Sequence, residues 1–320
     1  MAADHNEAMN PELRLPAADH RLQGVVRLQD WGVIRAQGDE ARSFLHGQLT
    51  QDVEHLAPGT ARLAGYCSAK GRLLASFVMW SPKADEVLLA CSADLLPAVL
   101  KRLSMFVLRA KCKLSDASAE LPLWGLAGEA AVQTAALPGS PWQVQAAGSG
   151  YALRLPDAAG VPRGLLVGLE AQTLPALEAE AWRWLEVQSG VARVTAATVE
   201  QFVPQMVNLE LVGGVNFQKG CYPGQEIVAR SQYRGTLKRR SYVLDADVPL
   251  LPGQEVFQSA DPGQPAGLVV LAGSRASGDY NALVELKTAA LVGGSLHLGS
   301  ATGPQLQLGA LPYAIPAEQG

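Results

Sequence analysis

The most informative stretch of the chain is KGCYPGQE, residues Lys219–Glu226. Its two glycines permit backbone angles that other residues avoid, and its proline suits the first turn of a helix. These features predict a tight turn followed by a helix over Gly224–Ser231. Cys221 would lie just before the helix N-terminus and close to Lys219, and both neighbours favour a thiolate. The alternative is an ordinary turn around a small buried cysteine, and the residues alone do not decide between the two.

A run of basic residues follows this stretch. Five cations lie within eleven residues, with no acidic residue among them: Arg230, Arg234, Lys238, Arg239 and Arg240. In a chain whose net charge is −4, such a run predicts a local positive surface. That surface would suit the phosphates of an RNA or the carboxylates of an anionic ligand. A solvated linker surface is the alternative for any run of charge.

Composition restricts the class of protein. The chain has 320 residues, of which 48% are hydrophobic and 18% charged, which predicts two or three folded domains. Residues 1–20 carry four acidic residues and no long apolar run, so we expect a disordered tail rather than a secretory signal. The apolar runs are too short to span a membrane, and we expect a cytoplasmic protein. The slight acidic excess argues against a general nucleic-acid coat protein.

The cysteines and histidines predict neither disulfides nor a metal site. Four cysteines are scattered without a C-x-x-C pair, and the five histidines never fall at zinc-ligand spacing. The thiols of a cytoplasmic protein are expected to stay reduced. Cys67, Cys91 and Cys112 lie in apolar patterns, which predicts small core residues.

Strands and helices are mixed along most of the chain, which predicts an α+β region over 21–240, built as two interleaved subdomains. Trp31 opens a predicted strand, and Trp182 lies on a predicted helix over Thr173–Ser189. Beyond residue 240, short apolar runs alternate with Pro-Gly and Gly-Ser clusters, which predicts a small C-terminal β-barrel over 241–320. The runs are Ser241–Leu244, Glu255–Phe257, Leu268–Leu271, Ala282–Leu286 and Ser295–Leu298.

These residues resemble those of a known family. The octapeptide Lys219–Glu226 matches the K-G-C-Y-x-G-Q-E motif of the YgfZ-type branch of the folate-binding, aminomethyltransferase-like proteins. Phe44–Val53 resembles that family's F-L-x-G-Q-x-T-x-D-V motif, and Ser68–Gly71 resembles its (S/D)-A-K-G turn. The family is related to the mitochondrial Iba-type iron–sulfur assembly factor. The resemblance covers most of the first 240 residues, and it implies an aminomethyltransferase-like α+β fold followed by a barrel.

The resemblance also implies a function. It implies a cytoplasmic protein that binds tetrahydrofolate and supports the assembly or repair of iron–sulfur enzymes, including those that thiomethylate tRNA. Its partners would be folate, iron–sulfur client or assembly proteins and, through the basic run, tRNA. The family's two folate-site tryptophans correspond to Trp31 and Trp182, with Trp184 as the alternative if the helix register differs. Indoles suit a flat pterin, because they offer stacking area at low entropic cost.

The remaining site residues come from the family's motifs. Cys221 is the expected functional thiol, and Asp52 is expected to orient a loop or the pterin. The other folate-binding residues that we expect are Lys219, Tyr222, Gln225, Glu226 and Arg230. The two indoles and the Cys221 sulfur are expected to share one hollow.

One departure from the family bears on whether the protein is an enzyme. Where aminomethyltransferases carry a pair of aspartates, this chain has Ala75 and Ser76, and neither can act as a carboxylate acid or base. The departure favours an accessory protein. The rival hypothesis is a folate-dependent aminomethyl- or methyl-transferase, and a third is a tRNA-binding module dominated by the basic run.

Overall fold

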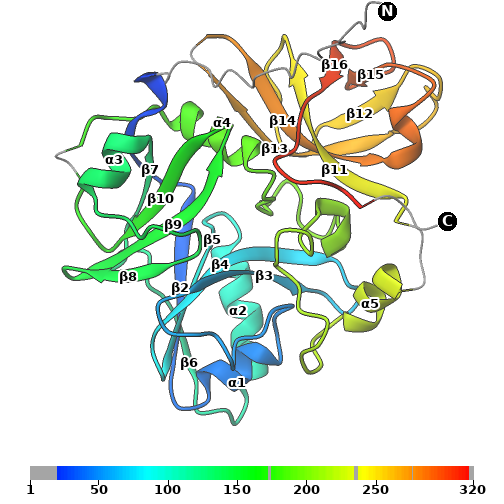
Figure 1. The fold of residues 1–320 in the computed structure, drawn as a ribbon. Coiled ribbons are helices and arrows are strands. Elements are labelled where there is room, and N and C mark those ends of the chain that lie inside the picture. Colours follow the sequence, from blue (N-terminus) through cyan, green and yellow to red (C-terminus); the bar gives the residue numbers. More distant parts are fainter. Residues whose placement is uncertain (1–19, 172–173, 234–236, 276, 317–320) are drawn as a thin grey trace, which may run out of the picture.

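The computed structural model describes residues 20–171, 174–233, 237–275 and 277–316. Within them the chain forms two five-stranded antiparallel sheets and a closed six-stranded barrel. The barrel stands at one end of the molecule and the sheets make up the rest (Figure 1). The predicted α+β fold with a C-terminal barrel is confirmed. The tail predicted over residues 1–20 lies outside the described residues, apart from its last residue.

The two sheets are interleaved along the chain. The first sheet has the order β1-β7-β10-β9-β8, with β1 (Gly24–Arg27), β7 (Leu123–Ala127), β8 (Val144–Ala147), β9 (Gly150–Ala158) and β10 (Val161–Val167). The second has the order β3-β4-β5-β2-β6, with β2 (Trp31–Gln37), β3 (Ala61–Cys67), β4 (Leu73–Lys83), β5 (Glu86–Ser92) and β6 (Lys113–Asp116). Because the chain leaves the first sheet to build the second and then returns, distant segments meet where the sheets pack.

The barrel runs from β11 (Arg239–Ala246) to β16 (Gln305–Leu308). Its other strands are β12 (Glu255–Gln258), β13 (Gly267–Ser274), β14 (Tyr280–Lys287) and β15 (Leu296–Leu298). Each of the five runs expected to form barrel strands does so. The strand β16 was not predicted from the sequence. It is short, and only Leu306 of its four residues is buried, so it lacks the apolar run that marks the other barrel strands.

Five α-helices connect these strands in the described residues. They are α1 (Ala41–His46), α2 (Leu96–Val107), α3 (Glu129–Thr134), α4 (Ala179–Gln188) and α5 (Gln225–Tyr233), with short 3-10 turns at His20–Leu22, Pro204–Val207 and Thr288–Leu291. The helix predicted after the KGCYPGQE turn is confirmed as α5. Among the described residues, no helix combines the length and the apolar character needed to cross a membrane.

The helix predicted over Thr173–Ser189 is shorter than expected. It begins at Ala179, and the proposed cap at its start lies outside the described residues. The residues before it are extended: the N–H of Val25 donates to the Pro175 oxygen at 2.8 Å, and the N–H of Leu177 donates to the Val25 oxygen at 2.8 Å. Pairing with β1 satisfies these backbone groups, so tertiary contacts override helix propensity here.

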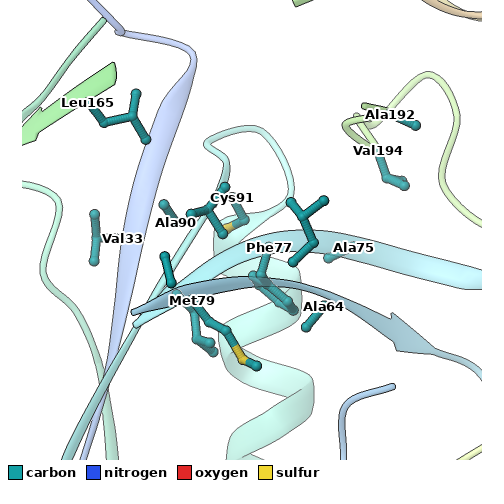
Figure 2. Packing of buried hydrophobic residues seen from close by; sticks show 14 of the residues in the cluster. Val33, Ala64, Ala75, Phe77, Met79, Ala90, Cys91, Leu165, Ala192 and Val194 are labelled. Atoms are coloured by element: carbon teal, nitrogen blue, oxygen red, sulfur yellow. The ribbon is translucent and has the colours of Figure 1, made fainter. Parts of the chain in front are cut away.

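The core lies between the sheets and fixes β2. Phe77 and Met79 of β4 are no more than 1% exposed, and they lie beside Ala90 and Cys91 of β5 (Figure 2). Val33 of β2 is fully buried in the same cluster. Since side chains alternate along a strand, burial of Val33 turns Trp31 toward the same side, at the beginning of β2.

The segment that precedes the KGCYPGQE turn fastens the barrel to the sheets. Arg240 of β11 is buried, donates to the Gln205 oxygen at 3.0 Å and forms an ion pair with Glu210. The side chain of Gln205 donates to the Val228 oxygen in α5 at 2.8 Å. A buried charge is costly to leave unpaired. This segment therefore sets the positions of both α5 and β11.

The ring of Trp182 on α4 packs directly against Gly125 of β7. A Cβ at position 125 would lie 2.7 Å from ring atoms of Trp182, which is 2% exposed. We predict that Gly125→Ala lowers the free energy of unfolding by ~1–3 kcal/mol, because the Trp182 ring or the β7 backbone must move to relieve the overlap. Urea unfolding measures this. The control is Gly139→Ala, where no atom lies within 4 Å of the new Cβ; equal losses in the two variants would contradict the packing argument.

Candidate functional site

Two of the predicted site residues line one cavity. Trp31, the first residue of β2, and Trp182, on α4, both face a space of about 50 Å³, which we call the indole cavity. Its wall also includes Ser76 of β4, Glu186 of α4 and Arg193, which follows α4. Residues from distant parts of the chain thus meet at one place, because the two sheets and α4 pack together there.

An arginine lies beside each of the two rings. The guanidinium carbon of Arg163 is 5.6 Å from the centre of the Trp182 ring, and that of Arg193 is 4.9 Å from the centre of the Trp31 ring. Arg163 is fully desolvated, and burial lowers its pKa to about 10. The cavity is therefore aromatic with positive charge at its edges, an arrangement in which cation–π attraction helps to hold the rings.

Trp184, the alternative to Trp182, lies on another face of α4. Its indole N–H donates to the side-chain oxygen of Asn281 in the barrel. It is not among the residues that line the indole cavity. The helix α4 thus presents one tryptophan to the cavity and the other to the barrel.

A buried ion pair forms part of the cavity wall. Arg193 Nε lies 3.1 Å from Glu186 Oε1, and Arg193 Nη2 lies 3.3 Å from Glu186 Oε2. The same guanidinium donates to the Asp30 carboxylate at 2.8 Å and to the Ser92 hydroxyl at 3.0 Å. Burial by itself would lower the pKa of Arg193, but Glu186 and Asp30 outweigh it and raise that pKa above its ordinary value. Arg193 therefore stays charged and holds a carboxylate at the cavity.

The cavity also holds hydrogen-bond donors without partners. The indole N–H groups of Trp31 and Trp182 are buried and have no partner among the described residues. Trp80 and Trp124 share this property elsewhere, so an orphaned indole does not mark a site. The distinguishing feature is a buried carboxylate, that of Glu186, beside two such donors. A ligand with matching polar groups would remove the cost of leaving buried donors unpaired.

A larger open hollow adjoins the indole cavity. Its volume is about 820 Å³, and Glu186 and Arg193 line both spaces. The rest of its wall comes from the loop before β2, the loop after β5, α4 and the barrel. Sites for small molecules have volumes of roughly 300–1,000 Å³, a range that includes the hollow and not the cavity. An elongated ligand would place one end at the indoles and the remainder in the hollow.

The KGCYPGQE turn lies elsewhere, against the turn that joins β3 and β4. Gly224 has φ +77 and Gly71 has φ +70, and a Cβ on Gly224 would lie 2.6 Å from the Gly71 Cα. Only glycines allow the two turns to approach so closely. On the other side, Lys219 Nζ donates to two carbonyl oxygens at and just beyond the end of α1. Between these two attachments, Cys221 is exposed.

Lys219 carries its charge next to this thiol. Its Nζ lies 4.8 Å from the centre of the Tyr222 ring. Burial lowers the pKa of Lys219 to about 8, against the opposing effects of Asp52, Cys221 and Glu54. Burial also raises the pKa of Tyr222. At neutral pH Lys219 is therefore mostly protonated, so a cation lies near Cys221.

Asp52 holds the loop that follows α1. Its carboxylate accepts from the backbone N–H of His55 at 3.1 Å and lies 2.9 Å from His55 Nδ1 and 3.1 Å from His46 Nδ1. Burial alone would raise the pKa of Asp52, but the two histidines together lower it below its ordinary value. The other ring nitrogen of His46 lies 3.5 Å from where a Cβ on Gly220 would be, so it faces the Cys221 turn. These contacts suit the loop-orienting role expected for Asp52.

The other three cysteines differ from Cys221. Cys67 and Cys91 are buried, and burial raises the pKa of each to about 12. Cys112 is half-buried, and burial raises its pKa too. The prediction of small core residues is confirmed for Cys67 and Cys91. Cys221 is the exposed cysteine among the four.

The expectation that the thiol and both indoles share one hollow is wrong. Cys221 lines neither the indole cavity nor the hollow, and the same holds for Lys219, Tyr222, Gln225, Glu226 and Arg230. The reason is the extended geometry of β4. The Cys221 turn packs at Gly71, before this strand, whereas the cavity wall begins at Ser76, roughly 17 Å further along at ~3.3 Å per residue.

The basic run is only partly available to a polyanion. Arg240 is buried in the ion pair described above, and Arg239 donates to both carboxylate oxygens of Glu285 at 2.7 Å. The prediction of a five-cation surface is therefore wrong for these two residues, because each is neutralised by a carboxylate from another segment. Arg234 lies outside the described residues. The exposed members are Arg230 and Lys238.

Sequence reasoning missed Glu186 and Arg193. A signal for Glu186 was present, since it lies four residues after Trp182 and hence on the same face of a helix. A glutamate on a predicted buried face is unusual unless it is paired. Arg193 carries no local signal, because its partners lie on three other segments.

Comparison with known proteins identifies relatives of this chain. It is 31% identical to the tRNA-modifying protein YgfZ of Edwardsiella ictaluri, over 98% of this chain and 99% of that protein. It is 32% identical to the protein of the same name from Photorhabdus laumondii, over 78% of this chain and 79% of that one. No family model matches the chain.

A solved structure has the same fold. The glycine cleavage system aminomethyltransferase T from Bartonella henselae superposes with a TM-score of 0.65 over 91% of this chain and 86% of that one, at 18% identity. That likeness concerns the fold alone. With 31% identity over nearly the whole of both proteins, the chain belongs to the family of the tRNA-modifying protein YgfZ.

Proposed function

We propose that this protein binds tetrahydrofolate, or a one-carbon derivative of it, at the indole cavity and serves tRNA modification as an accessory protein in the cytoplasm. The observation that carries the proposal is the Glu186 carboxylate, held by Arg193 beside the half-buried ring of Trp31 and the buried ring of Trp182. Membership of the YgfZ family supports the link to tRNA modification, and the aminomethyltransferase-like fold supports folate.

The chemistry of the site fits a pterin. A pterin carries a ring N–H and an exocyclic amino group side by side, and a carboxylate can accept both hydrogen bonds. Glu186 retains lone pairs for this purpose while it is paired with Arg193. Trp31 and Trp182 would flank the ring, and the aminobenzoyl-glutamate portion would extend into the adjoining hollow of about 820 Å³.

The same wall favours an accessory role over group transfer. Glu186 is the only carboxylate among the described residues of the indole cavity, and it is committed to Arg193. Ser76 accepts the backbone N–H of Val194 at 2.9 Å, so its hydroxyl is also engaged. The described wall therefore offers no unpaired carboxylate for general acid–base catalysis. When bound, the folate would supply or hold a one-carbon unit.

Cys221 would act at the protein surface, in support of iron–sulfur enzymes. It is exposed, it lies away from the indole cavity, and Lys219 lies beside it. A single thiolate cannot hold an iron–sulfur cluster, which takes about four ligands. Any contact of Cys221 with a cluster would therefore be shared with a client or assembly protein that supplies the other ligands.

The carboxylate contact can be tested directly. We predict that Glu186→Gln weakens tetrahydrofolate binding ~10-fold or more, because a hydrogen-bonded charge contributes about 1.5–3 kcal/mol. Calorimetric titration measures the affinity, and the thermal midpoint checks that the variant folds. Glu178→Gln, an exposed change at the start of the same helix, is the control. Equal affinity of the Glu186 variant and the wild type would remove the carboxylate from the site.

Thiol reactivity can be ranked by site. We predict that iodoacetamide labels Cys221 fastest at pH 7, because the pKa values of the other three thiols are raised by burial. Peptide mass spectrometry over a time course gives the four rates. Cys221→Ser should abolish the fast phase and leave folate affinity unchanged. Faster labelling of Cys67 or Cys112 would refute the assignment.

Lys219 makes the reactivity of Cys221 depend on pH. Because the pKa of Lys219 is about 8, its positive charge is largely present below that pH and is lost above it. We predict that Lys219→Met slows alkylation several-fold at pH 7, and that the two proteins converge as the pH rises from about 8 to 9.5. A constant ratio across that range would show that Lys219 acts through structure and not through charge.

A further inference from the structure

A basic surface lies at the C-terminal end of α2. It offers the exposed positive charge that the run after residue 230 provides only in part. Between Lys101 and Lys113 the sequence KRLSMFVLRAKCK holds five of the chain's 26 basic residues and none of its 30 acidic ones. The rest of the chain then has a net charge of −9. Four of the five, Lys101, Arg109, Lys111 and Lys113, are exposed, and none forms an ion pair within the described residues.

Apolar side chains lie among these cations. Met105 is 57% exposed, Phe106 44% and Leu108 87%, so three large hydrophobic residues are exposed within four positions. Arg102 is half-buried, and its guanidinium carbon lies 5.9 Å from the centre of the Phe106 ring. An exposed aromatic ring with an arginine beside it is a platform for a flat base.

The backbone at the end of α2 keeps this surface open. Leu108 has φ 44, a conformation that leucine rarely adopts, and its side chain points to solvent. Packing within the protein does not explain the choice of leucine there, since a glycine would fit the backbone with less strain. Such outliers gather where a binding partner meets the chain.

We propose that this basic and aromatic surface, residues 101–113, is an RNA-binding surface that docks a tRNA. The inference rests on the proposed role in tRNA modification and adds the place of contact. The cations would meet backbone phosphates, and Phe106 would stack on an unpaired base. The acidic remainder of the molecule would repel RNA and so favour this one orientation.

The geometry favours RNA over a membrane. A helix that lies on a bilayer exposes its whole apolar face. The apolar face of α2, with Leu96, Val99 and Leu103, is instead buried in the protein core. The large apolar side chains that remain exposed here are Met105 and Phe106 in the last turn and Leu108 just after it, flanked by cations. The Glu40 carboxylate lies close by and accepts from the backbone N–H of Lys111 at 2.6 Å.

The surface is linked to the indole cavity by α2 itself. The helix begins four residues after Ser92, which contacts Arg193, and it runs twelve residues away from that point. At 1.5 Å per residue its length is about 18 Å. A tRNA docked at residues 101–113 would thus lie on the half of the molecule away from the barrel (Figure 1), about one helix length from the proposed folate site.

The test is the affinity of the full chain for a fluorescein-labelled, unmodified tRNA transcript, measured by anisotropy between 50 and 200 mM KCl. We expect the triple variant Arg109→Gln, Lys111→Gln, Lys113→Gln to weaken binding ~10-fold or more at 100 mM salt. The slope of log affinity against log salt should fall by about 2, since each lost phosphate contact removes ~0.7–0.9. Phe106→Ala should weaken binding at least ~5-fold and leave that slope unchanged.

The matched control is Arg230→Gln with Lys238→Gln, which removes the two exposed cations of the other run and should change affinity less than twofold. Unchanged affinity in the triple variant, or an equal loss in the control, would overturn the proposal. The proposal would also be overturned if the triple variant lost binding to phosphatidylglycerol vesicles while its tRNA affinity stayed intact. That result would assign the surface to a membrane. Folate titration of the same variants separates the two proposals: failed folate binding in the wild type would end the folate proposal and leave the RNA measurement valid.

Discussion

The buried guanidinium of Arg193 is the contact on which the architecture of the cavity depends. It reaches Glu186 on α4, Asp30 before β2 and Ser92 at the end of β5, and it lies over the Trp31 ring. A buried charge must be paired on every side, because an unpaired one costs several kcal/mol. The three segments are therefore drawn to one point. Because Arg193 must be paired, it holds the Glu186 carboxylate beside Trp31 and Trp182 in the wall of the indole cavity.

The molecule separates its two chemically notable places. The indole cavity lies in the interior, at the meeting of both sheets and α4, whereas Cys221 lies on a surface turn fastened at Gly71 and at the end of α1. An aromatic cavity with a buried carboxylate suits recognition of a small ligand, because desolvation strengthens each hydrogen bond. An exposed thiol beside a lysine suits contact with another protein. The hairpin of β3 and β4 joins the two places, because the Cys221 turn packs at Gly71 in its turn and Ser76 of β4 lines the cavity.

Local patterns predicted more of the fold than of the site. The turn and helix around Cys221, the five barrel strands and the burial of Cys67 and Cys91 followed from glycines, prolines and apolar periodicity. The start of α4 did not, because Pro175 and Leu177 pair with β1 instead of forming a helical turn. Glu186 was missed for a related reason. Whether a glutamate on a buried face is tolerated depends on an arginine that the helix itself does not contain.

The sequence by itself determined the family motifs, the α+β fold with its barrel, and the turn, helix and neighbouring lysine around Cys221, since each depends on residues within a few positions of one another. The exposure of Cys221 was decided by the tertiary structure. The tertiary structure alone decided which charges remain free. Arg239 and Arg240 meet Glu285 and Glu210 from other segments. Within the described residues, the four exposed cations of residues 101–113 form no ion pair. Pairing of charges depends on distances in space, and the chain must fold before those distances exist.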